Sequence, residues 1–196
     1  MAFIVKQNTQ EKIVEEQQVE AFLNDQEVIY EKWNINKLPA NLQEKFLLTD
    51  DEKQQILEAF KAEIEDISAR RGYKAQDVIS LSDNTPNLDQ LLANFKQEHH
   101  HTDDEVRFIV SGHGVFVIQG KDGEFFEVFL NPGDLISVPE NTRHYFTLQD
   151  DRQVVAVRIF VTTEAGFLFT KRKKSASNHD DPQTLSKKKF FVVNIV

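Results

Sequence analysis

The hydrophobic residues of this chain change their spacing near His99, and this change limits the folds that the chain can adopt. Beyond His99 they recur at every second position in short runs, at 105–110, 115–118, 124–130, 135–138, 144–148 and 153–161. Turn residues separate the runs, as at Asp122-Gly123, where glycine allows the positive φ of a hairpin turn. Short alternating runs at this spacing predict a β-sandwich or a β-barrel.

The first 92 residues have a mostly helical pattern with short strand candidates. We expect helices over 12–24, over 41–48, from Thr49 to Gly72 and after residue 87, and strands over 27–33 and 78–81. The sequence therefore predicts a helical or mixed α+β region over 1–92, packed on a β-rich barrel region over 93–170. Residues 171–196 are expected to form a polar tail whose last residues could dock as a terminal strand, and the whole chain is expected to be a single domain.

Charge and composition exclude several classes of protein. The 196 residues include 23 Lys and Arg against 32 Asp and Glu, and the net charge of −9 would repel nucleic-acid phosphates. No apolar run approaches the roughly 18 residues of a membrane span, and the N-terminal apolar stretch is too short for a signal peptide. We therefore expect a cytoplasmic protein with no nucleic-acid or membrane partner. Because cysteine is absent, any metal must be held by histidines and carboxylates.

Two histidines just before the first β run have the spacing of a ligand pair. His99 and His101 are two residues apart, so in an extended segment both imidazoles point to the same side. Glu105 begins the next run, with Arg107 and Ile109 on its own face, which puts a carboxylate beside the imidazoles. A cation such as Arg107 on an interior face needs an acid or an anionic ligand as its partner.

A lone His-x-His is weak evidence, because such a pair in an exposed loop usually binds nothing. The longer string His-x-His-x3-Glu-x6-Gly, which ends at Gly112, is more specific. After 20 further residues comes a second string, Gly-x5-Pro-x-Asn-x2-His, which ends at His144. Asn141 stands there in place of a turn glycine, and asparagine visits the left-handed region more readily than most residues. A chance match of both strings is improbable, whereas His113 and His179 are interpreted as bystanders.

These two strings resemble the paired motifs of the cupin superfamily. The stretch Glu98-His-x-His-x2-Asp-Glu-Val-Arg-Phe-Ile-Val resembles the acireductone dioxygenase family in particular, and 85–98, 133–139 and 157–160 are similar to it as well. The resemblance covers about residues 20–167 and implies a mainly β fold. That fold is the cupin double-stranded β-helix, a jelly-roll barrel, with an N-terminal helical or mixed α+β extension. Phe167 stands where the family usually has tryptophan.

The resemblance also implies a cofactor, a reaction and site residues. The metal would be iron(II), one per chain, or nickel(II), bound by His99, His101, Glu105 and His144. The substrates would be O2 and the acireductone of methionine salvage, 1,2-dihydroxy-3-oxo-5-(methylthio)pentene. With iron the family gives formate and 4-methylthio-2-oxobutanoate, and with nickel it gives carbon monoxide, formate and 3-(methylthio)propanoate.

Further side chains are candidates for substrate binding and for proton transfer. The resemblance gives Arg107 and Arg158 a substrate-binding role, although either could form a structural ion pair. Phe95 and Phe146 are candidates for an apolar wall around the methylthio group, with core packing as the alternative. Asp104 is placed to hydrogen-bond a ligand imidazole or to take a substrate proton.

The motif pair alone leaves other functions open. One alternative is another metallo-cupin, either a different dioxygenase or a sugar-phosphate isomerase, which would need a clustered cationic pocket for phosphate. A non-catalytic cupin binding module is a second, and a zinc protein without redox chemistry is a third, because histidine and glutamate also suit zinc. We expect the chain to act as a monomer on small molecules.

Overall fold

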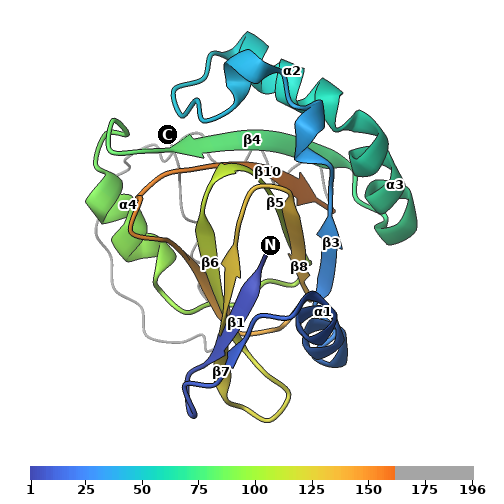
Figure 1. The fold of residues 1–196 in the computed structure, drawn as a ribbon, viewed down its shortest axis with the longest axis vertical. Coiled ribbons are helices and arrows are strands. Elements are labelled where there is room, and N and C mark those ends of the chain that lie inside the picture. Colours follow the sequence, from blue (N-terminus) through green and yellow to red (C-terminus); the bar gives the residue numbers. More distant parts are fainter. Residues whose placement is uncertain (162–196) are drawn as a thin grey trace, which may run out of the picture.

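The computed structural model describes residues 1–161, whose ten strands form two five-stranded antiparallel sheets that face each other (Figure 1). The first sheet has the order β2 (Lys12–Ile13), β1 (Phe3–Lys6), β7 (Phe125–Leu130), β6 (Gly114–Gln119) and β9 (His144–Leu148). The second has the order β3 (Ile29–Lys32), β8 (Asp134–Val138), β5 (Glu105–Gly112), β10 (Val154–Phe160) and β4 (Ala75–Leu81). The mainly β, cupin-like fold class predicted from the sequence is confirmed.

The space between the sheets is filled by alternate side chains of the strands. Every second residue of β7 and of β9 is buried, as the period of two requires. Phe116, Phe126 and Phe146 belong to this inner core, together with aliphatic residues of both sheets. The rings of Phe116 and Phe146, on the neighbouring strands β6 and β9, lie 5.1 Å apart within this core.

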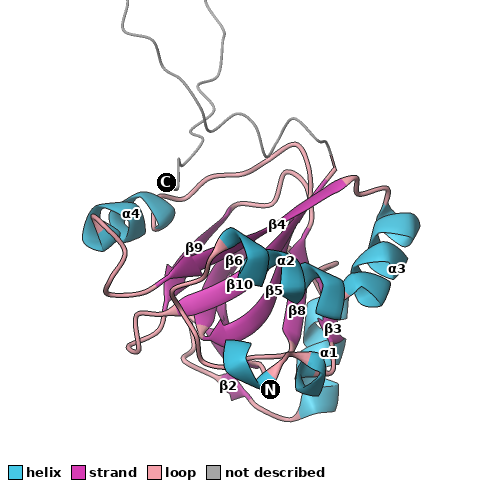
Figure 2. Cartoon of the chain, turned by 90° about the horizontal axis from the view of Figure 1, so that it is seen from above, coloured by secondary structure: helices cyan, strands magenta, loops and turns pink. Residues whose placement is uncertain are grey.

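Helices cover the outer face of the second sheet. Two of them, α2 (Asp50–Ala59) and α3 (Lys61–Arg71), lie over it in Figure 2. Their apolar side chains form a second core in which Phe60 packs on Phe108 of β5, with ring centroids 4.6 Å apart. Trp33 closes the cluster, 4.5 Å from the Phe108 ring. Both faces of this sheet are therefore buried.

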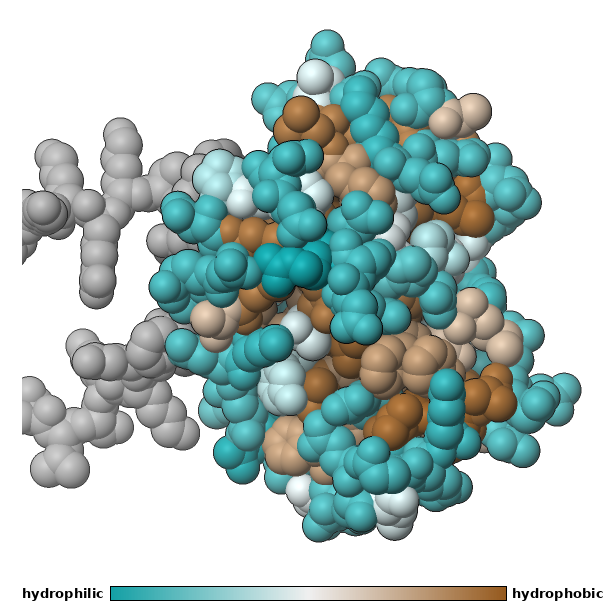
Figure 3. All heavy atoms as spheres, turned by 60° about the vertical axis from the view of Figure 1, so that its left-hand side comes forward, coloured by the Kyte–Doolittle hydropathy of each residue, from teal (hydrophilic) through white to brown (hydrophobic). Residues whose placement is uncertain are grey.

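The remaining helices lie at the sides of the barrel. The helix α1 (Glu16–Asp25) packs beside β3 and α4 (Leu88–Phe95) lies near β9, while two short 3-10 turns span Ile35–Lys37 and Ala40–Leu42. In Figure 3, where the α4 side comes forward, apolar atoms are visible in hollows between hydrophilic side chains. No helix within residues 1–161 is both long and apolar enough to cross a membrane.

Several N-terminal elements differ from the predictions. The strands β1 and β2 were not predicted, and the helix expected over 12–24 begins only at Glu16 because Lys12–Ile13 pairs with β1. The helix expected from Thr49 to Gly72 is interrupted at Phe60, whose φ of −110° departs from helical geometry. The helix expected over 41–48 is absent among the described residues, and only the 3-10 turn Ala40–Leu42 lies there.

Other local predictions are confirmed. The Thr49 hydroxyl accepts from the backbone of Glu52, whose side chain accepts from the backbone of Thr49, which is a capping box. Gly72 ends α3 in the left-handed region at φ 78°, and Asn141 has φ 61° as its turn position required. The strands β1 to β4, which all lie before residue 92, pair within the two sheets, so the barrel includes strands from the region predicted to be mostly helical. The expected tail over 171–196 and its possible terminal strand lie outside the described residues.

Candidate metal centre

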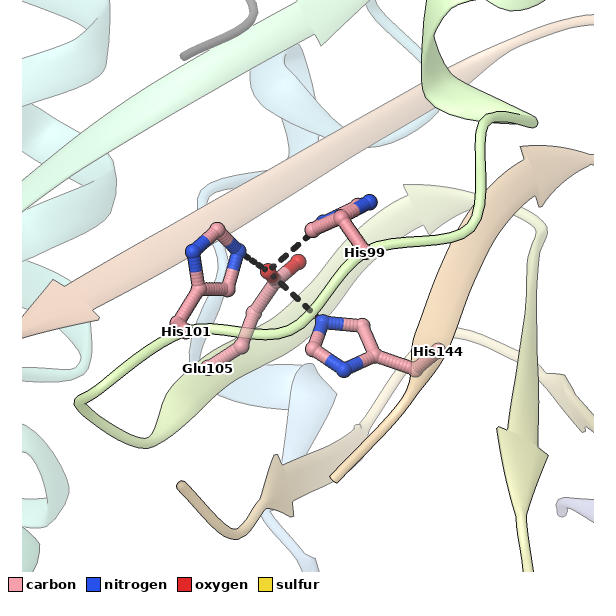
Figure 4. A group of neighbouring side chains, drawn as sticks. All are labelled: His99, His101, Glu105 and His144. Atoms are coloured by element: carbon pink, nitrogen blue, oxygen red, sulfur yellow. Dashed lines mark hydrogen bonds and ion pairs between the residues drawn. The ribbon is translucent and has the colours of Figure 1, made fainter. Parts of the chain in front are cut away.

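Four side chains from two separate parts of the chain meet at one end of the barrel (Figure 4). They are His99, His101, Glu105 and His144, and their potential ligand atoms all lie within 4.8 Å of one another. Glu105 is the first residue of β5 and His144 the first of β9, while the other two histidines precede β5. Figure 4 shows the three imidazoles arranged around the carboxylate.

Backbone hydrogen bonds hold the two segments side by side. The amide of His99 donates to the carbonyl of His144 at 3.0 Å, and that of His144 donates back at 2.9 Å. The amide of Asn141 donates to the carbonyl of His101 at 2.7 Å. The left-handed conformation of Asn141 thus brings the turn before β9 against the His101 segment, which explains the asparagine in the motif.

Two of the imidazoles are oriented by backbone carbonyls. Nδ1 of His99 lies 2.7 Å from the carbonyl oxygen of Gln97, and Nδ1 of His144 lies 2.8 Å from that of Thr142. Because a carbonyl only accepts, each Nδ1 carries the proton and donates it. In the neutral imidazoles each Nε2 therefore presents a lone pair to the interior of the site.

Those lone pairs meet another acceptor. Oε2 of Glu105 lies 3.1 Å from Nε2 of His144, 2.9 Å from Nε2 of His101 and 4.0 Å from Nε2 of His99. A neutral His144 with its proton on Nδ1 has nothing to donate to this carboxylate. The arrangement is favourable only if a cation or an added proton lies between the nitrogen and the oxygen.

The charge on Glu105 is stabilised by its surroundings. Burial favours the neutral acid, but Arg107, whose Nη2 lies 3.0 Å from Oε1, and the imidazoles outweigh it and hold the pKa of Glu105 well below 4.5. Burial also disfavours a charged His99, yet the nearby Glu105 carboxylate and the hydrogen bond to the Gln97 carbonyl raise its pKa above the usual value. The carboxylate is therefore ionised and aimed at the centre of the group.

The two arginines singled out from the sequence lie on the same inner face. Arg107 of β5 and Arg158 of β10 are directly opposite in the strand register, and Asp77 of β4 is opposite Arg158 on its other side. Nε and Nη2 of Arg158 donate to the two carboxylate oxygens of Asp77 at 2.7 and 2.5 Å. Burial lowers the pKa of Arg107, and Glu105 opposes that shift. Two cations thus lie next to each other across β5 and β10, with Asp77 beside Arg158 and Glu105 two residues before Arg107 on the same strand.

The two phenylalanines lie on the inner core, and Phe146 is two residues beyond His144 on β9. Phe146 is 8% exposed, and its ring centroid lies 6.4 Å from that of the half-buried Phe95. Phe116 lies behind them, 6.2 Å from the His144 ring. Both Phe95 and Phe146 also pack on the inner core, so they make the contacts expected from the alternative interpretation, core packing.

Asp104 makes its hydrogen bonds with groups other than the ligand imidazoles. Its carboxylate accepts hydrogen bonds from Nη2 of Arg71 at 2.6 Å, from Oη of Tyr73 at 2.8 Å and from the amide of Glu140 at 3.3 Å. Within residues 1–161 no hydrogen bond joins it to a ligand imidazole. Burial raises the pKa of Asp104, but Arg71 and Tyr73 outweigh this and lower it, so the group is a poor proton acceptor.

Two groups near the site were missed by sequence reasoning. Asp77 shares the inner face of β4 with Ile79 and Leu81. The strand was predicted to begin at residue 78, so the alternation of side chains along it did not indicate that Asp77 points inward. Tyr73 follows a helix end and carries no local motif. His113, which was predicted to be a bystander, is not one of the four residues, and its Nδ1 lies 2.7 Å from the carboxylate of Asp151. His179, the other predicted bystander, lies outside the described residues.

Comparisons with known proteins agree with this geometry. The model of the ARD/ARD′ family matches residues 2–167. An acireductone dioxygenase of Bacillus licheniformis is 76% identical over 159 residues, which are 81% of this chain and 88% of that protein. An acireductone dioxygenase of Bacillus subtilis is 74% identical over 152 residues, 78% of this chain and 85% of that protein.

A solved structure matches as well. It is an acireductone dioxygenase from Bacillus anthracis with a cadmium ion in its active centre. The TM-score is 0.82 at 68% identity, and the match covers 84% of this chain and 95% of that one. The chain therefore belongs to the acireductone dioxygenase (ARD/ARD′) family of metal-dependent dioxygenases.

Proposed function

We propose that His99, His101, Glu105 and His144 bind one divalent ion, iron(II) or nickel(II), at which this chain oxidises an acireductone with O2. The observation that carries the proposal is the Nε2 lone pair of His144, which faces the ionised Glu105 carboxylate at 3.1 Å. A divalent cation between these two acceptors satisfies both. The cadmium ion in the active centre of the Bacillus anthracis relative supports this reading.

The donor set fits a first-row divalent ion. Three neutral imidazoles and one carboxylate leave a net charge of +1 and supply four of six positions, so two positions are left for substrate oxygens. When bound, such an ion acts as a Lewis acid that lowers the pKa of an enediol and holds it as an anion. The same donors suit both metals, so they favour neither iron nor nickel.

The other residues of the site would bind and orient the substrate. Arg107, with its side chain 15% exposed, is held by Glu105 and would offset the negative charge of the bound enediolate. Arg158 would contribute a second positive charge from the adjacent strand, with Asp77 fixing the plane of its guanidinium. Phe95 and Phe146 would provide the apolar wall for the methylthio end and exclude water from it.

The proposed substrate is 1,2-dihydroxy-3-oxo-5-(methylthio)pentene, whose adjacent oxygens match two positions on the metal. The iron-loaded protein would release formate and 4-methylthio-2-oxobutanoate. The nickel-loaded protein would release carbon monoxide, formate and 3-(methylthio)propanoate. We further infer that the chain works as a cytoplasmic monomer without nucleic-acid or membrane partners, and the net charge of −9 supports the lack of a nucleic-acid partner.

The proposal is tested by metal reconstitution. Chelator-treated protein is loaded with one equivalent of Fe²⁺ or Ni²⁺ and mixed with the acireductone, whose absorbance is followed together with O2 uptake. Formate, carbon monoxide and the two acids are then quantified. Turnover with a different product set for each metal is expected. Absence of turnover with both metals, in protein that has bound either, would reject the proposed substrate.

A further inference from the structure

Asp104 connects three parts of the chain around the proposed metal centre. One carboxylate oxygen accepts from Arg71 at 2.6 Å and from Tyr73 at 2.8 Å, and the other accepts from the amide of Glu140 at 3.3 Å. Its side chain is only 11% exposed. A carboxylate with three donors in so enclosed a place has a defined position, because losing any donor leaves buried charge unsatisfied.

The two side-chain donors belong to the N-terminal part of the chain. Arg71 is the last residue of α3, Gly72 turns the backbone, and Tyr73 leads into β4. Tyr73 is 5% exposed, and its hydroxyl lies 3.2 Å from Oγ of Ser137 on β8 as well. The hydroxyl is therefore fixed from two sides, and it transmits the position of the helix end and of β8 to Asp104.

The segment that carries Asp104 has no strand pairing of its own. Residues 101–104 lie outside the strands, between the extended His99 segment and the start of β5, as Figure 4 shows for the turn after His101. Two of the proposed ligands, His101 and Glu105, flank this turn. A ligand set works only when its members are held within about 0.5 Å of the productive positions, and packing or outer hydrogen bonds must supply that restraint.

We propose that Arg71 and Tyr73 are positioning residues, which act through Asp104 to hold His101 and Glu105 in the geometry that binds the metal. The inference rests on the metal centre proposed above and adds a role for the helix α3 and for the α3–β4 turn. Asp104 thereby acts as the anchor of the turn, in place of the proton-transfer role predicted from its position next to Glu105. The amide of Glu140 extends the same anchor to the turn that precedes His144.

The test compares Arg71→Gln and Tyr73→Phe with Arg70→Gln in the full chain. Arg70 is a matched control, because it has similar exposure at the same helix end and pairs instead with Glu31 and Asp66. Co²⁺ is titrated into each chelator-treated protein, and the affinity and the d–d absorption spectrum are recorded. We expect about a tenfold loss of Co²⁺ affinity and a shifted spectrum for the first two variants, and neither change for the control.

Thermal melts of the metal-free proteins separate positioning from stability. Lower melting temperatures for Arg71→Gln and Tyr73→Phe, with wild-type Co²⁺ affinity and spectrum, would overturn the inference and leave the cluster a purely structural one. The same loss of affinity in Arg70→Gln would also overturn it, since the effect would then belong to the whole helix end. Wild-type protein that binds no Co²⁺ would instead refute the metal centre itself.

Discussion

Glu105→Gln tests the charge balance of the site in the metal-free protein. The carboxylate pairs with Arg107 at 3.0 Å, and the two side chains are 10% and 15% exposed. The glutamine keeps the shape but leaves the guanidinium without its counter-charge, and breaking a buried pair in this way costs about 3 kcal/mol or more. With a urea m-value of about 2 kcal/mol/M, a loss of about 3 kcal/mol lowers the unfolding midpoint by roughly 1.5 M.

The assay is urea unfolding of chelator-treated protein at pH 7, followed by circular dichroism. Glu124→Gln is the surface control and should stay within about 0.5 kcal/mol of wild type. The double variant Glu105→Gln, Arg107→Met removes both charges of the pair and should recover most of the lost stability, because neither replacement leaves a buried charge without its partner. A midpoint for Glu105→Gln close to that of wild type would refute the idea that this pair contributes to stability.

The stability difference between wild type and Glu105→Gln is expected to depend on pH. The folded protein holds the pKa of Glu105 below its ordinary value of 4.5, so ionised Glu105 stabilises the fold above that pH. This stabilisation is lost as the pH falls from about 4.5 toward the lower folded pKa. The difference in unfolding free energy between wild type and Glu105→Gln should therefore shrink below pH 4.5. A constant difference down to acid unfolding would contradict the assigned direction.

Three further variants separate the roles of neighbouring residues. His144→Ala should lose bound metal, measured by elemental analysis after dialysis, whereas His113→Ala should keep it; equal metal contents would remove His144 from the ligand set. Arg107→Met should retain metal but raise KM for the acireductone, and unchanged KM with a lower melting temperature would make Arg107 a structural residue. Gly114→Ala would place a Cβ 2.6 Å from the Phe146 ring, so we expect the melting temperature to fall with a loss of about 1–3 kcal/mol. An unchanged melt would mean that the ring moves freely.

Much of the site could be predicted because its residues lie in local patterns. His99 and His101 are related by the two-residue period of an extended segment, and Glu105 and Arg107 by that of a strand. The burial pattern of β5 confirms that parity, with Val106 and Phe108 on the opposite face in the second core. His144 is far away in the sequence, and its place beside His99 came from a motif rather than from periodicity.

The groups that sequence reasoning missed depend on contacts between distant segments. Phe3–Lys6 was not predicted to be a strand, because apart from the two-residue β2 its pairing partner is β7, more than 100 residues later. Asp104 has a sequence position that suggests catalysis, yet its partners come from α3 and β4. Spacing within one segment says nothing about which distant donor reaches a carboxylate, so such roles need the tertiary structure.

The groups proposed to do chemistry lie at one end of the barrel, next to an apolar layer of the inner core. The groups proposed to do chemistry share one end of the barrel, where Glu105 begins β5, Arg158 lies near the end of β10, and His144 begins β9, whereas the buried Asp134 begins β8 at the other end. Antiparallel pairing brings the end of β10 beside the start of β5, and the backbone pairing of His99 with His144 brings the start of β9 to the same place. Beneath them Phe116 and Phe146 form an apolar floor in contact with the core. A change in this apolar layer should therefore act on stability, whereas a change at the metal end should act on metal or substrate binding and, at the Glu105–Arg107 pair, on stability as well. His144 connects the metal end with the apolar layer, because its backbone pairs with His99 while its ring lies above Phe116.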